Sequence, residues 1–366
     1  MQTRLASAAD NSALLALTAA CPMEGDLVVC NDRQPDFFAL HRLEGNRWVV
    51  GVAEDTVAGV VGCVSLAERA VHVRGAPARS FYVSDLKVRP DFRGRGVAGG
   101  LFRLIQRLAS EAGPDVPALV TVLAGNVAME RRITTPGGLP PLTRIATLRL
   151  HAIPLLWRRP IPRGDGLTIR PGEARDLEEM ADCWRRVAPQ RQFAPVLDAD
   201  ALAQWIANAP GLSPESYWLA RDRDGRLAGF VALWDRSACA QLRVLRYGWR
   251  AALLRVGLEA LGRSLGATPL PPAGAPLRHL SALHVCVPAS RPEVLHSLLI
   301  RAYAAVRGLG YVFFTIGLDR RDPLSIALRG LLAVPTDIHA YVATPAGPYV
   351  GPPLDDRPLH YETALV

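Results

Sequence analysis

The clearest pattern of apolar and polar positions runs from residue 81 to residue 112. Tyr82, Val83, Leu86 and Val88 are apolar and β-prone, and Pro90 then ends the run, which predicts a β-strand. Further on, apolar residues recur at i, i+4, i+7, i+8, i+11 and i+15, which is the spacing of one helix face. These residues are Val97, Leu101, Leu104, Ile105, Leu108 and Ala112. The segment is therefore predicted to be a strand, a short turn and an amphipathic helix.

The turn between this strand and this helix is typical of an anion site. It reads Arg93-Gly94-Arg95-Gly96-Val97-Ala98. Its glycines let the backbone approach a ligand, and the free N–H groups of the helix start favour a negative charge. The chain has no Gly-Lys-Ser/Thr of a Walker loop, and its single G-x-G-x-x-G match, Gly94 to Gly99, is a weak dinucleotide signal. We therefore predict a phosphate group at this turn.

The segment resembles motif A of the GNAT superfamily of acyl-CoA N-acyltransferases. The loop of that family reads Arg or Gln, two residues, Gly, one residue, then Gly or Ala, and Arg93, Gly96 and Ala98 occupy these positions. The resemblance implies an α/β (α+β) fold with a mixed, mostly antiparallel sheet flanked by helices, and acetyl-CoA as cosubstrate. It also implies contacts to the pantetheine arm from the strand and to the pyrophosphate from the loop. The residues concerned are Leu86, Lys87, Val88, Arg93, Gly94, Arg95, Gly96, Val97 and Ala98.

The acceptor amine of such an enzyme must lose a proton, and a carboxylate commonly accepts it. Asp85 is the first candidate, because Ser84-Asp85 resembles an acidic pair that small-amine acetyltransferases carry on this strand. A backbone-bonded Asp at a strand bulge is the alternative interpretation. Ser84 is a candidate proton donor, and Glu54, in a predicted hairpin turn, is a weaker candidate base.

Four further positions follow from the resemblance. Asn126 matches an Asn after the next strand, but Ile133 stands where the family often has a Tyr that protonates the departing thiolate. Ser84, a water or a nearby Tyr would then supply that proton, or the reaction runs without a dedicated acid. Glu24 and Asp26 lie where the family binds acceptors and are candidate substrate ligands, although a plain surface loop is an alternative.

The two halves of the chain repeat one plan. Arg4 and Asp10 are spaced like Arg170 and Asp176, and later blocks match at 57–62 with 227–232 and at 83–88 with 280–285. The last alignment places Ala282 opposite Asp85 and predicts an insertion of about 27 residues within 236–276. We therefore expect two GNAT copies.

The second copy has lost the anion loop, because a proline and β-branched residues replace its glycines. The expected divisions are an acetyl-CoA-binding domain, a linker, a degenerate domain and a Pro/Gly-rich tail. These span residues 1–154, 155–166, 167–345 and 346–366. Some relatives bring their C-terminal carboxylate into the active site, but this tail gives little support for that.

Composition narrows the function classes. The net charge is +8, but it is spread along the chain without runs of like charge, which favours an anionic cofactor over nucleic acid. Six cysteines without regular spacing predict free thiols in the cytoplasm, and the eight histidines form no metal-binding motif. We expect no metal, no nucleic acid and no membrane, and a monomer (pseudo-dimer) or homodimer.

The sequence thus predicts an N-acetyltransferase acting on a primary amine, either a small molecule or a protein amine. A non-catalytic acyl-CoA sensor is the alternative, since the expected Tyr is missing.

Overall fold

The structure is a computed structural model that describes residues 1–134, 142–161, 164, 166–349, 351 and 353–365. Side chains 254, 258, 261 and 263–265 also lie outside this description. The first half begins with a strand–helix unit and a long antiparallel meander, followed by the predicted strand, turn and helix. Its elements are β1 Gln2–Leu5, α1 Asn11–Ala19, β2 Leu27–Asp32, α2 His41–Glu44, β3 Arg47–Asp55, β4 Gly59–Val73, β5 Ala76–Val88, α3 Val97–Ala112, β6 Ala118–Leu123, α4 Val127–Thr134 and β7 Thr143–Pro154.

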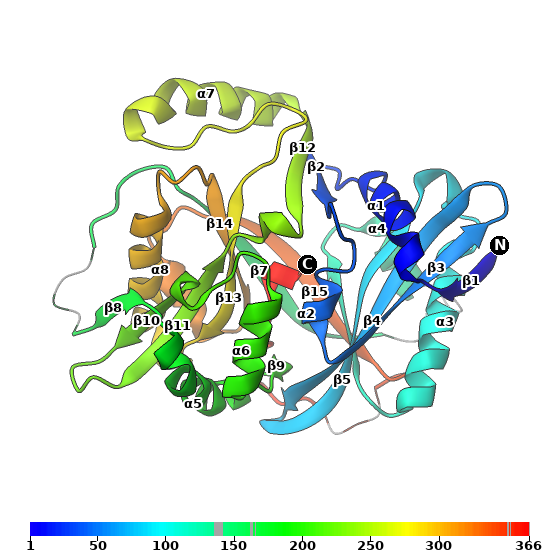
Figure 1. Ribbon diagram of the computed structural model, residues 1–366, viewed down its shortest axis with the longest axis horizontal. Helices are drawn as coiled ribbons and strands as arrows, with labels where there is room; N and C mark the ends of the chain where they lie inside the picture. The colour runs from blue at the N-terminus through cyan, green and yellow to red at the C-terminus, as the bar shows by residue number, and fades with distance from the viewer. Residues whose placement is uncertain (135–141, 162–163, 165, 350, 352, 366) are drawn as a thin grey trace.

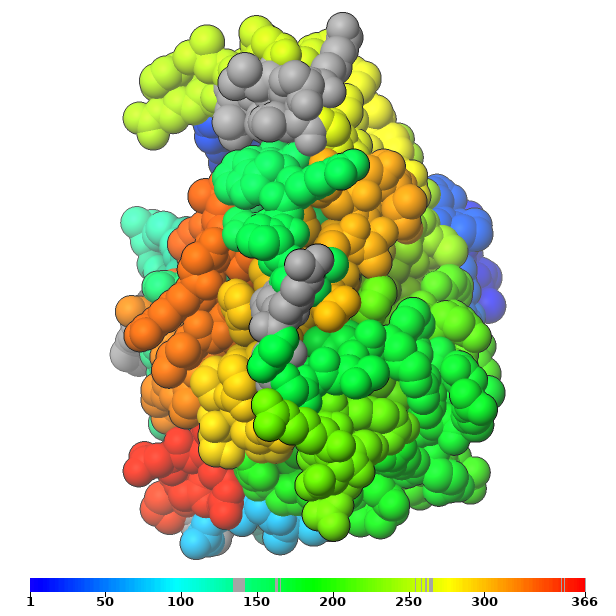
Figure 2. All heavy atoms as spheres, turned by 90° about the vertical axis from the view of Figure 1, so that its left-hand side faces the viewer, coloured from blue at the N-terminus to red at the C-terminus, as the bar shows by residue number. Residues whose placement is uncertain are grey.

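The second half follows the same order with one insertion. Its elements are β8 Thr168–Pro171, α5 Leu177–Val187, β9 Ala194–Pro195, α6 Ala199–Asn208, β10 Tyr217–Arg221, β11 Leu227–Trp234, β12 Gln241–Tyr247, α7 Trp249–Leu265, β13 His279–Cys286, α8 Pro292–Val306, β14 Phe313–Asp319 and β15 Val334–Ala343. The predicted insertion within 236–276 is occupied by β12 and α7, and β12 pairs with β2 of the first half. Helix α7 projects from the body of the molecule (Figures 1 and 2).

One continuous sheet runs through both halves. Its strand order is β1-β3-β4-β5-β6-β15-β7-β14-β13-β11-β10-β8, with β9 attached to β4. Most neighbours are antiparallel, and two pairs, β5 with β6 and β13 with β14, are parallel. The expected mixed, mostly antiparallel sheet flanked by helices is therefore confirmed (Figure 1).

The last strand of each half is exchanged. β15 lies between β6 and β7, and β7 pairs with β14 of the second half. Each half therefore completes the sheet of the other, and a sheet edge that an isolated half would expose is paired. The predicted end of the first domain at residue 154 stays a prediction.

The repeat is confirmed in its first block. Asp10 accepts two hydrogen bonds from the Arg4 guanidinium, and Asp176 accepts two from Arg170, at 2.6–2.9 Å. Both carboxylates also sit in a capping box at the start of a helical turn. An equivalent buried carboxylate, Asp10 in the first half and Asp176 in the second, thus anchors the first helix of each half.

The later blocks align differently from the sequence alignment. Gly62 pairs with Ala53 as Gly229 pairs with Ala220, so these two glycines are equivalent. The predicted match of Ala282 with Asp85 is wrong, since the residue with left-handed backbone in β13 is His284 (φ 50°), as Asp85 (φ 53°) is in β5. A β-bulge lies beside each of them, and a bulge adds a residue that sequence matching cannot place.

The tail folds back into the centre of the molecule, and part of the predicted linker and the terminal Val366 lie outside the described residues. Thr363 donates a hydrogen bond to the Ala282 carbonyl, and the Glu362 carboxylate accepts from the His284 N–H. A Cβ added at Gly317 of β14 would meet Thr363 at 2.4 Å. The tail thus occupies the space between β13 and β14. Its earlier part lies beside the tip of the β4–β5 hairpin, near Gly75 (Figure 2).

Because the tail is part of the core, truncating a buried tail side chain should destabilise the protein. Leu359 is 2% exposed, and Leu359→Ala should lower the free energy of unfolding by about 2–5 kcal/mol in urea denaturation. The control Leu332→Ala, at an exposed leucine (46%), should change it by less than about 0.5 kcal/mol. Equal effects of the two substitutions would contradict this placement of the tail.

Candidate functional site

The turn before α3 forms an open backbone cradle. Gly94 and Gly96 adopt φ values of 80° and 81°, which favour glycine, and a Cβ added at either would meet nothing within 4 Å. In the described part of the chain, the N–H groups of Gly94, Gly96, Val97, Ala98 and Gly99 have no backbone or side-chain acceptor. Five donors and the positive end of the α3 dipole therefore face open space, which is the arrangement that binds a phosphate.

The side chains of this turn do not cover the cradle. Arg93 donates from Nε to the Val88 carbonyl, and the Arg95 guanidinium lies 4.8 Å from the Phe92 ring centroid. Val97 and Ala98 are buried and anchor the helix to the core. Gly62 lets this helix approach β4, because a Cβ there would meet Val97 Cγ1 at 2.8 Å. The donors of the turn thus remain accessible.

β5 and β6 separate beside the cradle. They pair at only three positions, from Phe81 with Ala118 to Val83 with Val120. Beyond Val83 the bulge at Ser84 and Asp85 interrupts β5, and its last residues, Leu86 to Val88, no longer pair with β6. A gap between the two strands thus leads to the turn, and the predicted pantetheine-binding residues lie along it.

Asp85 lies in a buried cluster of charges. Its Oδ2 is 2.5 Å from Arg33 Nη1 and 3.2 Å from His41 Nε2, and Lys87 Nζ pairs with its Oδ1. Burial alone would raise the pKa of Asp85, but the charges of Arg33 and Lys87 outweigh it and hold this pKa well below 3.8. A carboxylate paired in this way is a poor proton acceptor at neutral pH. Asp85 lies at a strand bulge, as the alternative interpretation expected, but among the described residues its carboxylate pairs with side-chain charges and not with the backbone.

His41 connects this cluster to a second carboxylate. Its Nδ1 lies 3.2 Å from Glu44 Oε2, on the side away from Asp85. Burial lowers the pKa of His41, but its hydrogen bonds to Asp85 and Glu44 outweigh burial and raise it. A protonated His41 then donates to both carboxylates and fixes the side chain of Glu44.

A cavity of about 330 Å³ lies between the two halves. It is lined by residues of α2, β4, β5, α6, β13 and the tail, and Glu44 is among them. The Ser84 hydroxyl lies 3.0 Å from Glu44 Oε1 and 2.5 Å from Ser65 Oγ. Ser84 thus connects the bulge of β5 to Glu44, a carboxylate that the sequence interpretation missed.

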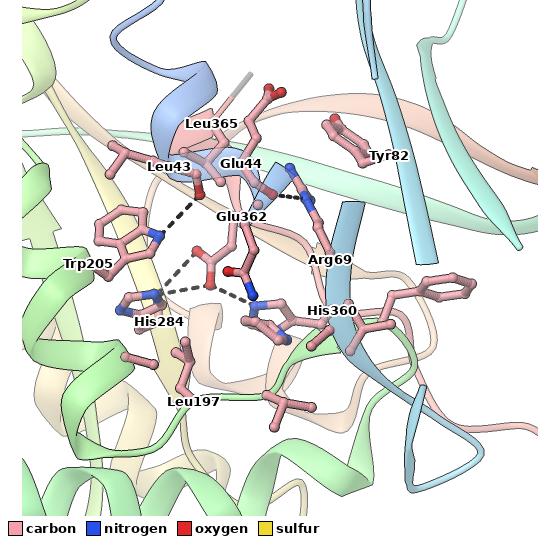
Figure 3. Close-up of a pocket in the computed structure, with 18 of the residues that line it drawn as sticks. Leu43, Glu44, Arg69, Tyr82, Leu197, Trp205, His284, His360, Glu362 and Leu365 are labelled. Carbon is pink, nitrogen blue, oxygen red and sulfur yellow. Dashed lines mark hydrogen bonds and ion pairs between the residues drawn. The ribbon is translucent and has the colours of Figure 1, made fainter. Parts of the chain in front are cut away.

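Tyr82 and Arg69 form one wall of this cavity. The Tyr82 hydroxyl is 3.1 Å from Thr121 Oγ1 on β6, and burial raises the pKa of Tyr82 above 10. The Arg69 guanidinium lies 4.0 Å from the Tyr82 ring centroid. In Figure 3, Glu44, Arg69 and Tyr82 lie on one side of the cavity, while Glu362 points toward His284 and His360. Tyr82 is thus a tyrosine close to the bulge, and it fits the nearby Tyr that the sequence analysis named among the alternative proton donors.

Glu362 is a buried tail carboxylate with its own partners. The Glu362 carboxylate accepts a hydrogen bond from His360 Nε2 at 2.6 Å and another from the backbone N–H of His284 at 3.2 Å. Burial raises the pKa of Glu362, but the charge of His360 and its hydrogen bond lower it overall. Burial also lowers the pKa of His284 to about 4, so this imidazole is neutral at pH 7. Glu362 therefore stays ionised and holds the tail at the bulge of β13.

Other predicted site residues lie away from this cavity. Glu54 pairs with Arg4 at 2.9 Å at the sheet edge. Glu24 lies 3.7 Å from Arg246, and Asp26 accepts a hydrogen bond at 2.7 Å from the N–H of Ala251 in α7. These two acids hold the insertion against the first half, and the structure does not bring them to the cavity.

Asn126 directly precedes α4 and Ile133 lies on this helix, on the other side of the gap. Asn126 Oδ1 accepts from the Met129 N–H at 3.2 Å and so caps this helix, which leaves its amide nitrogen for another partner. Ile133 packs against the core beneath α3. An apolar residue in that position cannot transfer a proton, so any proton donor must come from another residue.

The second half lacks the cradle. Pro292 is the first residue of α8 and has no N–H, and Arg291 pairs with Glu293 across the helix start at 3.0 Å. The tail fills the neighbouring gap. The degeneration predicted from Pro292 and Val294 is therefore consistent with the geometry.

Within the described residues, no group of three or more His, Cys, Asp or Glu side chains has the geometry of a metal site. A search of the described helices also finds none that is long and apolar enough to cross a membrane.

The charge cluster at the bulge leads to a test of stability against pH. Asp85→Asn leaves Arg33 buried without its carboxylate, which should cost about 3–5 kcal/mol of unfolding free energy at pH 7. Since the folded pKa of Asp85 is below 3.8, its contribution is complete above about pH 4 and is lost as the pH falls through the folded pKa. The difference between wild type and variant should therefore shrink below about pH 4 in urea titrations.

The control for this test is Asp91→Asn, which removes an exposed partner of Arg89 and should cost less than about 1 kcal/mol. A difference between wild type and Asp85→Asn that stays constant with pH would contradict the assignment.

Three comparisons place this geometry among known proteins. Residues 13–131 match the model of the acetyltransferase (GNAT) family. N-myristoyltransferase of Saccharomyces cerevisiae, solved with bound myristoyl-CoA, is similar with a TM-score of 0.63 and 13% identity, over 97% of this chain and 87% of that one. A GCN5-related N-acetyltransferase of Sphaerobacter thermophilus is similar with a TM-score of 0.59 and 16% identity, over 94% of this chain and 95% of that one. No curated protein sequence matches the chain.

The structural similarities extend over nearly the whole chain, and at these identities they show the fold. The family match covers the segment that carries the cradle, the bulge and the gap between β5 and β6. Residues 13–131 thus match the acetyltransferase (GNAT) family model, and over nearly its whole length the chain shares the fold of these two solved structures.

Proposed function

We propose that the protein is an acyl-CoA-dependent N-acyltransferase whose first half binds the acyl-CoA. The observation that carries this proposal is the cradle of free N–H groups at residues 94–99, at the end of the gap between β5 and β6. The pyrophosphate would accept from these groups, and the pantetheine would follow the unpaired edge of Leu86 to Val88. Asn126, with its free amide nitrogen, lies across the gap.

We propose acetyl-CoA as the donor. A small apolar cavity of about 50 Å³ lies beside β5, β6 and α3, lined by Val83, Phe102 and Val120 among others. A space this small supports a short acyl group over a long one. A series from acetyl-CoA to myristoyl-CoA would measure the preference.

The cavity between the halves is the proposed acceptor site. A volume of about 330 Å³ lies near the lower end of the roughly 300–1,000 Å³ that small-molecule pockets span, which supports a small amine over a protein segment. Glu44 is the proposed base because it lines this cavity beside the bulge and is positioned by Ser84 and His41.

The proposed reaction is a direct transfer. The amine gives one proton to Glu44, and its lone pair attacks the thioester carbonyl, which forms the C–N bond. The C–S bond then breaks and the thiolate takes a proton, while the acylated nitrogen releases its second proton to solvent, from which the proton donor is reprotonated. Tyr82 is the proposed donor of that proton, in place of the Tyr that Ile133 replaces; the Ser84 hydroxyl is the alternative donor.

A non-catalytic acyl-CoA sensor is the second candidate. The observation that favours it is Ile133, whose side chain packs in the core where a catalytic Tyr is expected. Acyl-CoA binding without turnover on a broad amine panel would support this function. A cytoplasmic location and a monomeric or homodimeric state remain predictions.

The cradle is tested by titrating acetyl-CoA calorimetrically into wild type and Gly96→Glu. The added carboxylate would face the pyrophosphate, and the affinity should fall at least about tenfold (about 1.4 kcal/mol). Gly225→Glu is the matched control, since Gly225 also has a positive φ (79°) and open space around its Cβ. Unchanged affinity of Gly96→Glu, or an equal loss in the control, would contradict this site.

The base is tested by steady-state kinetics of Glu44→Gln. The substitution keeps the shape of the side chain and removes the proton acceptor, so kcat should fall about 10²- to 10⁴-fold while acetyl-CoA affinity stays within about twofold. Glu68→Gln, which removes a partly exposed partner of Arg79 on β4, should leave kcat unchanged. Full activity of Glu44→Gln would exclude this residue as the base.

A further inference from the structure

Arg69 is a cation in the acceptor cavity without an anionic partner. Its Nε donates to the Glu44 carbonyl, and its guanidinium stacks on Tyr82. In the described part of the chain neither Nη atom has a hydrogen-bond acceptor, and Nη2 is buried. A buried donor without an acceptor costs about 1–3 kcal/mol or more, so such a group in a cavity indicates a partner that arrives from outside.

The other cations of this region are already paired. Arg33 and Lys87 hold Asp85, and Arg42, at the rim of the same cavity, pairs with Asp36 at 2.6 Å. His360 donates to Glu362, and His284 is neutral at pH 7. Among the described residues, Arg69 thus differs from the charged groups around it in having no partner for either Nη atom.

The chemistry of a guanidinium indicates the missing partner. Its planar donors match a carboxylate in two parallel hydrogen bonds, and a charged hydrogen bond is stronger than a neutral one. Stacking on Tyr82 and the bond to the Glu44 carbonyl fix the plane of the group. A carboxylate of a ligand could therefore bind without the loss of much side-chain freedom.

The position of Arg69 next to Glu44 constrains the rest of the ligand. Both residues line the cavity, and the Glu44 backbone is hydrogen-bonded to the Arg69 side chain. An amine held at the Glu44 carboxylate would thus have its own carboxylate a short distance away. Trp48, Leu197 and Trp205 also line the cavity and add apolar surface to it.

We propose that the acceptor is a free α-amino acid with an apolar side chain, whose carboxylate is bound by Arg69. This inference rests on the proposed function, because it assigns the acceptor of the same site. The ammonium group lies at Glu44, the carboxylate at Arg69 and the side chain against Trp48 and Trp205.

The test compares amino acids with their amides. The probes are L-phenylalanine, L-leucine, L-methionine and L-tryptophan, each beside its primary amide, which keeps the amine and the side chain and removes the negative charge. Acetyl transfer from acetyl-CoA gives kcat/KM, and calorimetry on the CoA-saturated protein gives affinity without turnover. Wild type should favour at least one amino acid over its amide about 10- to 150-fold, as expected for a charged hydrogen bond of about 1.5–3 kcal/mol.

The variants separate recognition from folding. Arg69→Gln should abolish this preference mainly through KM, Arg69→Lys should retain part of it, and Arg79→Gln, at an exposed arginine outside the cavity, should retain all of it. Acetyl-CoA affinity and the thermal midpoint of each variant report an intact fold. If the Gln variant is unfolded, the ratio in Arg69→Lys, which should fall below that of wild type, decides the test.

The inference and the proposed function fail differently. If amides react or bind as well as amino acids, or if no amino acid of the panel binds the CoA-saturated protein, the inference is overturned while acetyl-CoA binding can stand. If acetyl-CoA does not bind at all, the proposed function fails. Binding of amino acids in preference to amides would then still support the role of Arg69.

Discussion

The bulge of β5 at Asp85 is the constraint on which the rest of the site depends. A left-handed residue other than glycine is strained, and the buried ion pairs of Asp85 with Arg33 and Lys87 hold it in place. The bulge separates β5 from β6 and so opens the gap that leads to the cradle at Gly96. Through His41, the same cluster orients Glu44 in the cavity on the other side. One buried carboxylate thus lies between the cradle and the cavity, which are the proposed donor site and the proposed acceptor site.

Because β7 and β15 are exchanged, the first half, which carries the cradle, needs a strand of the second half to complete its sheet. Each half receives its last sheet strand from the other, and the cavity lies where the halves meet. The second half contributes His284 to this cavity, and the tail contributes Glu362. The tail also fills the gap between β13 and β14, so the degenerate copy has become a support that completes the acceptor site without offering a second donor site.

Local patterns were sufficient for part of this account. The cradle and α3 follow from glycines and apolar spacing within 20 residues, and both are in the structure as predicted. The environment of Asp85 could not be predicted, because Arg33 and His41 come from a segment about 50 residues earlier and meet it only in the folded state. The sequence likewise did not single out Arg69, because the lack of a partner for its Nη atoms among the described residues is a property of the folded structure. The second copy was misaligned by two residues at His284, because a shift of two residues leaves the same strand positions on the same face of the sheet.

The central claim is that acyl-CoA binds to the cradle of the first half and not to the second half. Hydrogen exchange of the backbone amides, measured with and without acetyl-CoA, tests it most directly, since the five free N–H groups of the cradle would become hydrogen-bonded. The account predicts slower exchange at residues 94–99 and no change at residues 291–298 of the second half. Protection at the start of α8, or no protection at the cradle at saturating acetyl-CoA, would contradict it.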